Sequence, residues 1–583
     1  MNKSEKLICL VLGALLAWYI WSEMGKQKER AAAQPTESLA VQATTAEQPT
    51  KSLAEQTAEQ PAAAAARRAT EHKSAEKTVT LENELVKLEL SNFGGVVKKA
   101  TLKTYALGLG EVSAENPAVA LDFRLAPLGA IGGLACVAPD SDYEVKSASP
   151  TEVVFANDAV ERKITLKPGY QIVYEDTFLK GTDENAITSL SLGAMAMGGS
   201  KNDLLSVDSY AENAGKGKPG VVHHSDDDSP LKPYLVGGLT GGCSGSKSAA
   251  GMPAKAELKV NGAQRYIALK NRFFVTALAS CDQGNLGFDA AVTREVTSAN
   301  YRPEAISAAA LFGGAPAKRV TVFYAGPKKQ SLLWDLGMKD VMEFGMWRWL
   351  CYPLVWVLNL FNDFIPNYGV AIILLTILVR ILFWPLTHKS TVGMKKMQEI
   401  QPLMKEIQAR CKDNPQKLQQ ETWALYRDHK VNPMSSFLPM LIQIPVFIAL
   451  FNVLRSAVEL RYAPFLWIAD LSEPEGLFAS WFPFGGLNLL PILMAVTTAL
   501  QSYFTPSAGD KKQQQMMMIM MPAMMLVMFY SFPAALSLYW FLSNLFSIVQ
   551  MYLIRRATAK EQGAVITPEV IDPPATRQMK RHG

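Results

Sequence analysis

Residues 368–386 read YGVAIILLTILVRILFWPL, and this stretch decides the fold of the second half of the chain. It is long and apolar enough to cross a bilayer as a helix, which takes about 20 such residues. Its one full charge, Arg380, lies roughly 10 Å before the polar end at Thr387. An arginine that faces lipid there costs about 3 to more than 10 kcal/mol. The side chain therefore either extends along its own stem to the headgroups or faces a hydrated cavity lined by protein.

The rest of the second half predicts an α-helical transmembrane bundle. Four further apolar stretches are long enough for spans, at residues 437–454, 487–504, 516–532 and 536–554. Polar side chains within these stretches favour a hydrated interior over lipid. Thr376 lies one turn before Arg380 on the same helical face, and Gln443 and Asn544 would be costly in contact with lipid.

The charges between the spans predict the orientation. Residues 388–432 are basic and carry apolar side chains at helical spacing, interrupted at Pro415. They form either an amphipathic helical hairpin or a solvated connector. The loop at 459–486 is acidic instead. Because cytoplasmic loops concentrate Lys and Arg, we expect the 388–432 segment and the tail at 557–583 in the cytoplasm.

The first half is organised differently. Residues 1–22 hold an apolar run behind Lys3 and Lys6 with no small-residue cleavage site directly after it, which predicts an uncleaved signal-anchor helix and brings the count to six spans. Residues 23–75 are rich in Ala, Gln, Thr, Glu and Pro and predict a disordered linker. Both termini are then cytoplasmic, and the part that follows the linker lies outside the cytoplasm.

Residues 76–328 alternate polar and apolar side chains, as at Val86, Leu88 and Leu90, and predict an all-β sandwich. The sequence Lys-Pro-Gly at 167–169 predicts a hairpin inside it. Residues 329–366 contain an apolar run too short to span a bilayer, with several tryptophans, and predict an interfacial amphipathic helix. A transmembrane core follows this region and is predicted at residues 367–556.

The run MMMIMMPAMM at residues 516–525 has the most unusual local composition in the chain. Methionines here are either apolar filler that faces lipid or neighbouring helices, or an adaptable surface along which many different segments can slide. Flexible thioether side chains favour the second interpretation.

Motifs for chemistry are absent. The six cysteines show no CxxC pair, and the chain has no GxxxxGK[ST], HExxH or GxSxG motif, so we expect no enzyme activity, no cofactor and no metal. His223, His224 and the acidic residues 226–228 predict a solvated loop rather than a metal site. Cys243 and Cys281 could pair outside the cytoplasm. A secondary transporter would usually show two matching halves, and none is visible.

Several motifs resemble the YidC membrane protein insertase family, in its Gram-negative form with a large periplasmic domain. They are TILVR at 376–380 with PLT at 385–387, ALY at 424–426 with VNP at 431–433, LIQIPVF at 441–447, PILM at 491–494 and SNL at 543–545. The resemblance implies a multi-domain inner-membrane protein with a periplasmic all-β supersandwich, related in fold to sugar-binding domains, and a six-span bundle with a cytoplasmic hairpin.

The resemblance also implies a function. Family members insert and help to fold membrane proteins through a hydrophilic groove open to the cytoplasm and to lipid, alone or with the Sec translocon, and nascent clients and the ribosome are the implied partners. The groove residues would be Arg380, Thr376, Gln443, Asn544, Tyr539 and Trp540, the last standing where a tyrosine is expected. The surface along which clients slide would include Phe447, Phe451, Met521 and Met525.

Overall fold

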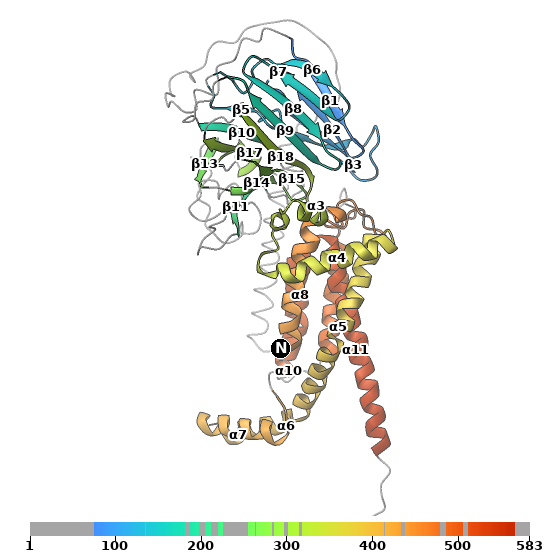
Figure 1. Ribbon diagram of the computed structural model, residues 1–583. Coiled ribbons are helices and arrows are strands. Elements are labelled where there is room, and N and C mark those ends of the chain that lie inside the picture. Colours follow the sequence, from blue (N-terminus) through green and yellow to red (C-terminus); the bar gives the residue numbers. More distant parts are fainter. Residues whose placement is uncertain are drawn as a thin grey trace, which may run out of the picture. The chain divides into compact units, whose positions relative to one another are not determined.

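The computed structural model divides into two compact units (Figure 1). The first contains residues up to Val355 together with Asn452–Ala463, and the second contains Trp356–Phe451 and the residues from Pro464 on. The described residues are 75–134, 136–180, 187–196, 205–211, 220–224, 255–262, 264–282, 285–296, 301–313, 317–412, 414–432, 438–478, 486–504 and 511–565. The predicted anchor at 1–22, nearly all of the predicted linker, the acidic residues 226–228, Cys243 and the tail beyond 565 lie outside them.

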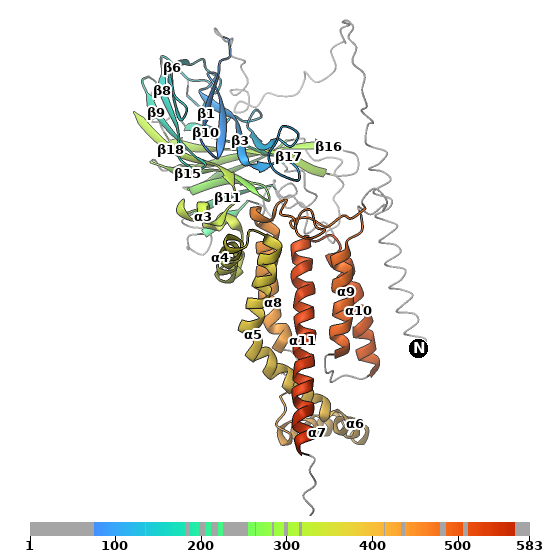
Figure 2. The same ribbon diagram turned by 90° about the vertical axis from the view of Figure 1, so that its right-hand side faces the viewer.

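Three antiparallel sheets build the first unit (Figures 1 and 2). One sheet has the order β1 (Thr78–Glu82), β2 (Val86–Ser91), β3 (Val96–Ala106), β4 (Ala118–Asp122). The second has the order β13 (Lys255–Asn261), β16 (Gly287–Val296), β17 (Tyr301–Gly313), β10 (Ile187–Ala196), β5 (Ile131–Gly132). The third has the order β12 (Gly220–His223), β11 (Ser206–Ala211), β14 (Gln264–Lys270), β15 (Phe274–Cys281), β18 (Lys318–Pro327), β9 (Gln171–Phe178), β8 (Val160–Leu166), β7 (Glu152–Ala156), β6 (Glu144–Ala148).

The alternation in the sequence matches this β-rich structure. In β2, Val86, Leu88 and Leu90 are buried while the residues between them are partly exposed. The predicted hairpin joins β8 to β9 as antiparallel neighbours. Gly169 adopts a φ of 88° in its turn, a conformation that favours glycine.

Buried charges in this core escaped the sequence analysis. Arg162 and Asp176 are directly opposite each other on β8 and β9, and both are fully buried. The Arg162 guanidinium donates to Asp176 through Nε (2.6 Å) and Nη2 (3.1 Å). Arg319 of β18 is also fully buried, with Nη2 3.7 Å from an Asp176 oxygen. One carboxylate therefore lies between two buried cations.

Short helices follow the sheets: α3 (Gln330–Asp335), η2 (Lys339–Met342), η3 (Gly345–Trp347) and α4 (Arg348–Phe364). Helix α4 contains the apolar run that is too short to span a bilayer. It buries Cys351 and Leu354, whereas Trp349 and Trp356 are 66% and 62% exposed. This distribution suits an interfacial helix, and its location at a membrane surface stays a prediction.

The second unit is helical. Its elements are α5 (Tyr368–Glu399), α6 (Gln401–Arg410), α7 (Pro415–Asp428), α8 (Leu438–Ser456), α9 (Leu489–Phe504), α10 (Lys511–Phe529) and α11 (Ala534–Val565), while η5 (Val458–Leu460) follows α8 in the first unit. Asn367 caps α5 by accepting a hydrogen bond from the Val370 N–H (3.1 Å). The helix does not end near residue 386 as its apolar stretch suggests, because no helix-breaking sequence follows and Pro385 is accommodated inside it.

Two of the described helices are long and apolar enough to cross a membrane, α5 and the part of α11 at Ala534–Leu553. Three shorter apolar helices, Gln443–Ser456, Leu489–Phe504 and Met518–Phe529, fall within α8, α9 and α10. Five predicted spans thus correspond to apolar helices, two of them of full spanning length. The number of spans stays a prediction.

Side-chain contacts give the relative directions of these helices. Arg380 of α5 contacts Ser543 of α11, and about two turns further along both helices Gln550 donates to Thr387 (3.0 Å), so α5 and α11 run parallel. The start of α9 lies beside the end of α10, because Asn488 donates to the Tyr530 carbonyl (2.6 Å).

Helix α8 runs antiparallel to α11. Its Gln443 contacts Tyr539, and Phe451, two turns later on α8, lies against Phe532, which precedes α11. Successive helices therefore alternate in direction, as consecutive spans must (Figure 2).

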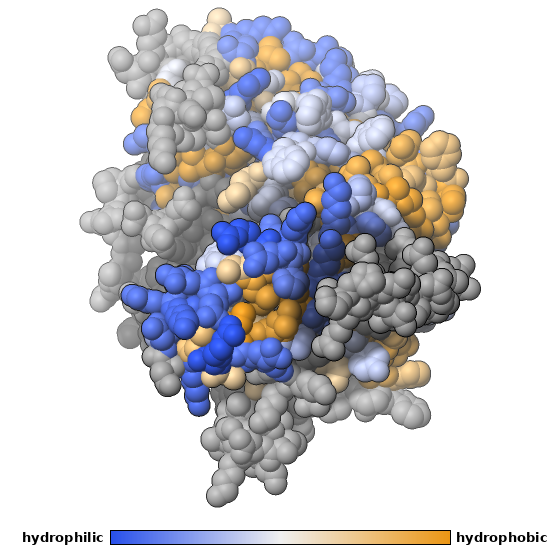
Figure 3. Space-filling model, turned by 90° about the horizontal axis from the view of Figure 1, so that it is seen from below, coloured by the Kyte–Doolittle hydropathy of each residue, from blue (hydrophilic) through white to orange (hydrophobic). Residues whose placement is uncertain are grey.

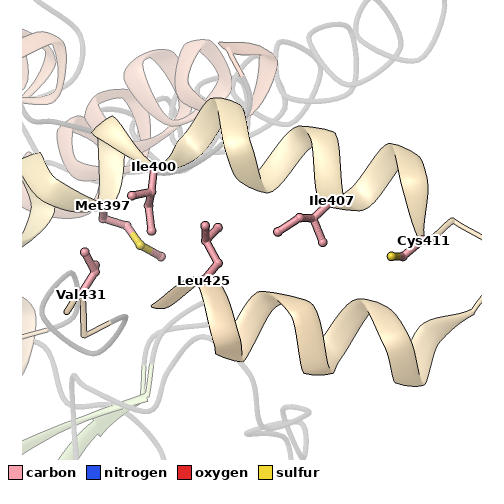
Figure 4. Packing of buried hydrophobic residues seen from close by; sticks show 6 residues of the cluster. All are labelled: Met397, Ile400, Ile407, Cys411, Leu425 and Val431. Atoms are coloured by element: carbon pink, nitrogen blue, oxygen red, sulfur yellow. The ribbon is translucent and has the colours of Figure 1, made fainter. Parts of the chain in front are cut away.

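Helices α6 and α7 form the predicted hairpin. One apolar cluster holds them together, with side chains from α6, α7 and the residues that flank them (Figure 4): Met397, Ile400, Ile407, Cys411, Leu425 and Val431. Asn414 caps α7 by accepting from the Lys417 N–H (3.0 Å), and Arg410 pairs with Glu421 across the two helices (2.5 Å). The segment is thus a packed helix pair and not an extended connector.

Candidate functional site

Arg380 reaches across to the neighbouring helix. Its Nη2 donates to the Ser543 carbonyl (2.5 Å) and to the Ser543 hydroxyl. A side chain that extended to the headgroups would instead lie along its own helix toward Thr387. The observed contact favours a guanidinium held by protein groups within the helical bundle.

Thr376, one turn before Arg380, is fully buried. Its hydroxyl donates to the Ile372 carbonyl of its own helix (2.7 Å), a common way for threonine to satisfy its donor in an apolar helix. Thr376 therefore adds a small side chain beside Arg380 with its donor already engaged.

A second polar pair joins α8 to α11. Gln443 donates through Nε2 to the Tyr539 hydroxyl (3.0 Å), and Tyr539 is buried. Tyr539 lies one turn before Ser543 on α11, so both pairs fall along one stripe of that helix. The result is a row of polar groups that runs from α8 across α11 to α5, and we call it the polar row: Gln443, Tyr539, Ser543 and Arg380.

The sequence analysis did not assign roles to Ser543 or to the pair Gln550 and Thr387. Helical spacing could have found Ser543, because it follows Tyr539 by one turn and belongs to the SNL motif. Gln550 is a polar residue within the apolar stretch 536–554, and its partner Thr387 lies at the polar end of the 368–386 stretch. The α5–α11 contact is thus polar at two levels.

Asn544 lies elsewhere. It is buried, and its Nδ2 donates to the Thr498 hydroxyl of α9 (2.8 Å). Successive side chains on a helix point about 100° apart at 3.6 residues per turn, so Asn544 faces α9 while Ser543 faces Arg380. The structure places Asn544 in the packing between α9 and α11 and not in the polar row.

The residues predicted to form the sliding surface occupy two environments. Phe447 and Phe451 of α8 lie in an aromatic cluster, and Trp540 is within it, with ring centroids 5.0 Å from Phe447. Met521 of α10 is 37% exposed and Met525 is partly buried. Seen from below, the molecule shows a hydrophobic patch bordered by hydrophilic side chains (Figure 3).

The described part of the chain contains no group of three or more His, Cys, Asp or Glu placed to hold a metal ion. Within that same part, Cys136 and Cys411 are free thiols. The possible pairing of Cys243 with Cys281 lies outside what the structure describes.

Two family profiles match this chain. Residues 360–561 match the 60 kDa inner membrane protein family, and residues 242–357 match the YidC periplasmic domain. The chain belongs to the YidC family. The polar row and the aromatic cluster both fall within the 360–561 match.

Individual relatives agree with this assignment. The membrane protein insertase YidC of Syntrophobacter fumaroxidans is 42% identical over 311 residues, 52% of this chain and 56% of the relative. YidC of Methylobacillus flagellatus is 28% identical over 580 residues, 96% and 99% of the two chains. The alignments to the most similar curated relatives span about half of those relatives' length.

Among solved structures, a crystal structure of an active YidC insertase with its first transmembrane domain resolved is similar, at 19% identity and a TM-score of 0.33. That likeness covers 82% of this chain and 93% of the solved one.

Proposed function

We propose that this chain is a membrane protein insertase that passes the polar part of a client along the polar row while the client's apolar segment enters lipid. The observation that carries the proposal is Arg380, held by Ser543 inside a bundle of apolar helices. A partly buried cation among apolar helices is costly unless water or a client's polar groups reach it. A groove that must receive polar chain segments gives it a use.

The mechanism follows from the energetics of the two client parts. A short hydrophilic region resting near Arg380 crosses less hydrocarbon, so its desolvation barrier falls. Burial of the client's apolar side chains in lipid then supplies the driving force, at roughly 25 cal/mol per Å². The step breaks no covalent bond, and the chain acts as an insertase and chaperone, not as an enzyme.

Client recognition has an electrostatic and an adaptable part. Arg380 attracts acidic groups in the translocated region over short distances, because the surroundings screen poorly. Met521 and Met525 provide flexible apolar contacts for client segments of different shape. Gln443, Tyr539, Thr376 and Trp540 lie near the path as polar or amphipathic contacts, and Phe447 and Phe451 form its aromatic wall.

The implied setting is the bacterial inner membrane. The β-rich part at 76–328 lies in the periplasm. The 329–366 region lies at the periplasmic surface of the inner membrane, and the core at 367–556 spans that membrane. The hairpin at 388–432 and both termini are cytoplasmic, in accord with the loop charges. Partners are nascent membrane proteins and lipid, with the Sec translocon and the ribosome as further partners.

Site-specific photo-crosslinking tests the proposal against a transporter. A crosslinker at Met525 should trap nascent membrane proteins during synthesis. The matched control is Val496 of α9, which is 61% exposed and lies outside the proposed path. Trapping of nascent chains at both positions equally, or at neither, contradicts an insertase groove at this place. Depletion of the protein should in addition remove specific membrane proteins from the membrane proteome.

A further inference from the structure

A tight turn between α8 and α9 carries two large apolar residues at its tip. Phe465 and Ile468 exchange both of their backbone hydrogen bonds (2.9 and 2.8 Å), so Leu466 and Trp467 form a two-residue connection. Leu466 has a φ of 52°, a left-handed conformation that favours glycine or asparagine. Leu466 is nevertheless 75% exposed, and Trp467 is 42% exposed. A bulky apolar residue thus occupies a turn position where a small or polar one would cost less.

The turn lies against the start of α5. The Asn367 side-chain amide is 3.5 Å from the Pro464 carbonyl oxygen. Gly369, in the first turn of α5, leaves room for the Phe465 ring, because a Cβ at this glycine would lie 2.0 Å from the Cγ of Phe465. Helix α5 is long and apolar enough to cross a membrane, and it begins at Tyr368. The tip of the turn therefore lies at the level where this helix enters the membrane.

The start of α9 holds the other side of the turn. Trp467 donates through Nε1 to the Glu475 carboxylate (3.2 Å). The same carboxylate accepts from the N–H groups of the first two residues of α9 (2.9 and 2.6 Å). Asp470 accepts from the N–H and the hydroxyl of Ser472 (both 2.7 Å). Both carboxylates thus have partners within this part of the protein, and the tip itself presents hydrocarbon and no charge.

More exposed apolar residues come from the segment that leads into α5. Phe364 and Ile365 are 77% and 44% exposed, and they precede Asn367 by only three and two residues. Single exposed apolar residues are normal on a water-facing surface. A bulky residue in a left-handed turn, fixed beside a helix of spanning length, instead indicates a contact made there. Tryptophan is the residue enriched at the headgroup level of membranes, because its ring is apolar and its N–H is polar.

We propose that Leu466 and Trp467 insert into the periplasmic leaflet of the membrane beside α5, and we call this pair the loop anchor. Its partner is the boundary between lipid headgroups and acyl chains. The loop anchor fixes the depth of the start of α5, and with it the depth of Arg380, relative to the membrane surface. This inference goes beyond the handling of clients, because it requires only that α5 crosses a membrane. Since the tip carries no charge, the contact does not depend on the charge of the headgroups.

Depth-dependent fluorescence quenching tests the loop anchor. The full-length protein with Leu466→Cys in a cysteine-free background is labelled with an environment-sensitive fluorophore and reconstituted in phosphatidylcholine liposomes. A nitroxide near the headgroup end of the lipid acyl chains should quench the label several-fold more than iodide present on both sides of the membrane. Leu125→Cys is the matched control, because Leu125 is 57% exposed in the β-rich unit; there iodide should quench more strongly. Adding phosphatidylglycerol should leave both patterns unchanged.

Trp467→Cys carries the same prediction if Leu466→Cys does not enter liposomes as a folded protein. Iodide quenching at position 466 as strong as at position 125 overturns the loop anchor. Quenching by a nitroxide on the headgroup alone also overturns it, because the tip would then stay outside the acyl region. Protection from iodide that requires another added protein assigns this surface to a protein partner and overturns the lipid contact.

Leu466→Gly separates lipid contact from packing within the protein. Glycine suits the left-handed φ at this position, so the substitution should not lower the melting temperature of the protein. It should nevertheless raise iodide quenching of a label at Trp467→Cys several-fold, because the leucine no longer holds the tip in the membrane. A lower melting temperature with unchanged quenching would make Leu466 a packing residue and contradict the loop anchor.

Discussion

The buried carboxylate of Asp176 should be essential to the stability of the β-rich unit. In Asp176→Asn, the amide cannot neutralise the two guanidinium groups that now face it. Arg162 cannot move out to water, because its Nη1 also donates to the carbonyls of Gly94 (3.1 Å), Gly95 (3.1 Å) and Gly129 (2.7 Å). Removing one partner of a buried ion pair costs about 3–5 kcal/mol.

The expected change in melting temperature follows from the size of the unit. For a domain of roughly 250 residues, each kcal/mol shifts Tm by about 2–4 °C, so Asp176→Asn should lower Tm by about 6–20 °C. The control is Asp122→Asn, because Asp122 pairs with Arg124, whose side chain is 79% exposed. An exposed pair contributes about 0–1 kcal/mol. Thermal unfolding of the full-length protein, followed by circular dichroism in the β-sheet region, measures both. Equal losses of Tm would refute the assignment of Asp176 as a buried counter-ion.

Three further predictions concern other parts of the chain. Burial lowers the pKa of Lys328 from 10.5 to about 8, and nearby Lys270 adds to the effect. Between these two pH values the folded state binds fewer protons than the unfolded state, so the charged lysine destabilises the fold at pH 7. Lys328→Met should therefore stabilise the protein at pH 7 by on the order of 3 kcal/mol, and chemical denaturation should show this gain vanishing as the pH rises from about 8 to 10.5. Replacing Met521 and Met525 by lysine should abolish client crosslinking while the protein stays in the membrane, whereas leucine should change little; a leucine defect as large as that of lysine would argue for a specific thioether requirement. In a cysteine-free background, Asp470→Cys should react with an impermeant thiol reagent added outside and Lys412→Cys should not, and the reverse pattern would contradict the orientation.

Periodicity predicted much of this architecture. Alternation at Val86, Leu88 and Leu90 gives the correct inward face of β2, and the spacing of Met397, Ile400 and Ile407 gives the correct inner face of the hairpin. Both succeed because burial of apolar side chains dominates the choice of face.

Failures occurred where a polar group was buried with a partner distant in sequence. Arg162 sits in the inward register of β8, yet only the pairing with β9 supplies Asp176. Asn544 was predicted in the groove because it is polar within an apolar stretch. Its side chain faces α9, because one step along a helix turns a side chain toward a different neighbour, and its role toward clients stays a prediction. A separate failure concerns the end of α5. The apolar stretch ends near residue 386, but the helix continues to Glu399, because no helix-breaking sequence follows.

The charge at position 380 offers the most direct test of the central claim. Arg380, Arg380→Lys, Arg380→Ala and Arg380→Glu variants should be compared in an insertion assay across clients graded by the acidic charge of their translocated region. We expect alanine to impair insertion in proportion to that charge, lysine to retain much of the activity because a point charge suffices, and glutamate to fail. Clients with short uncharged tails should insert with all forms. Equal insertion of every client by the Arg and Ala forms would contradict a charged groove and leave Arg380 as a residue that the bundle merely tolerates.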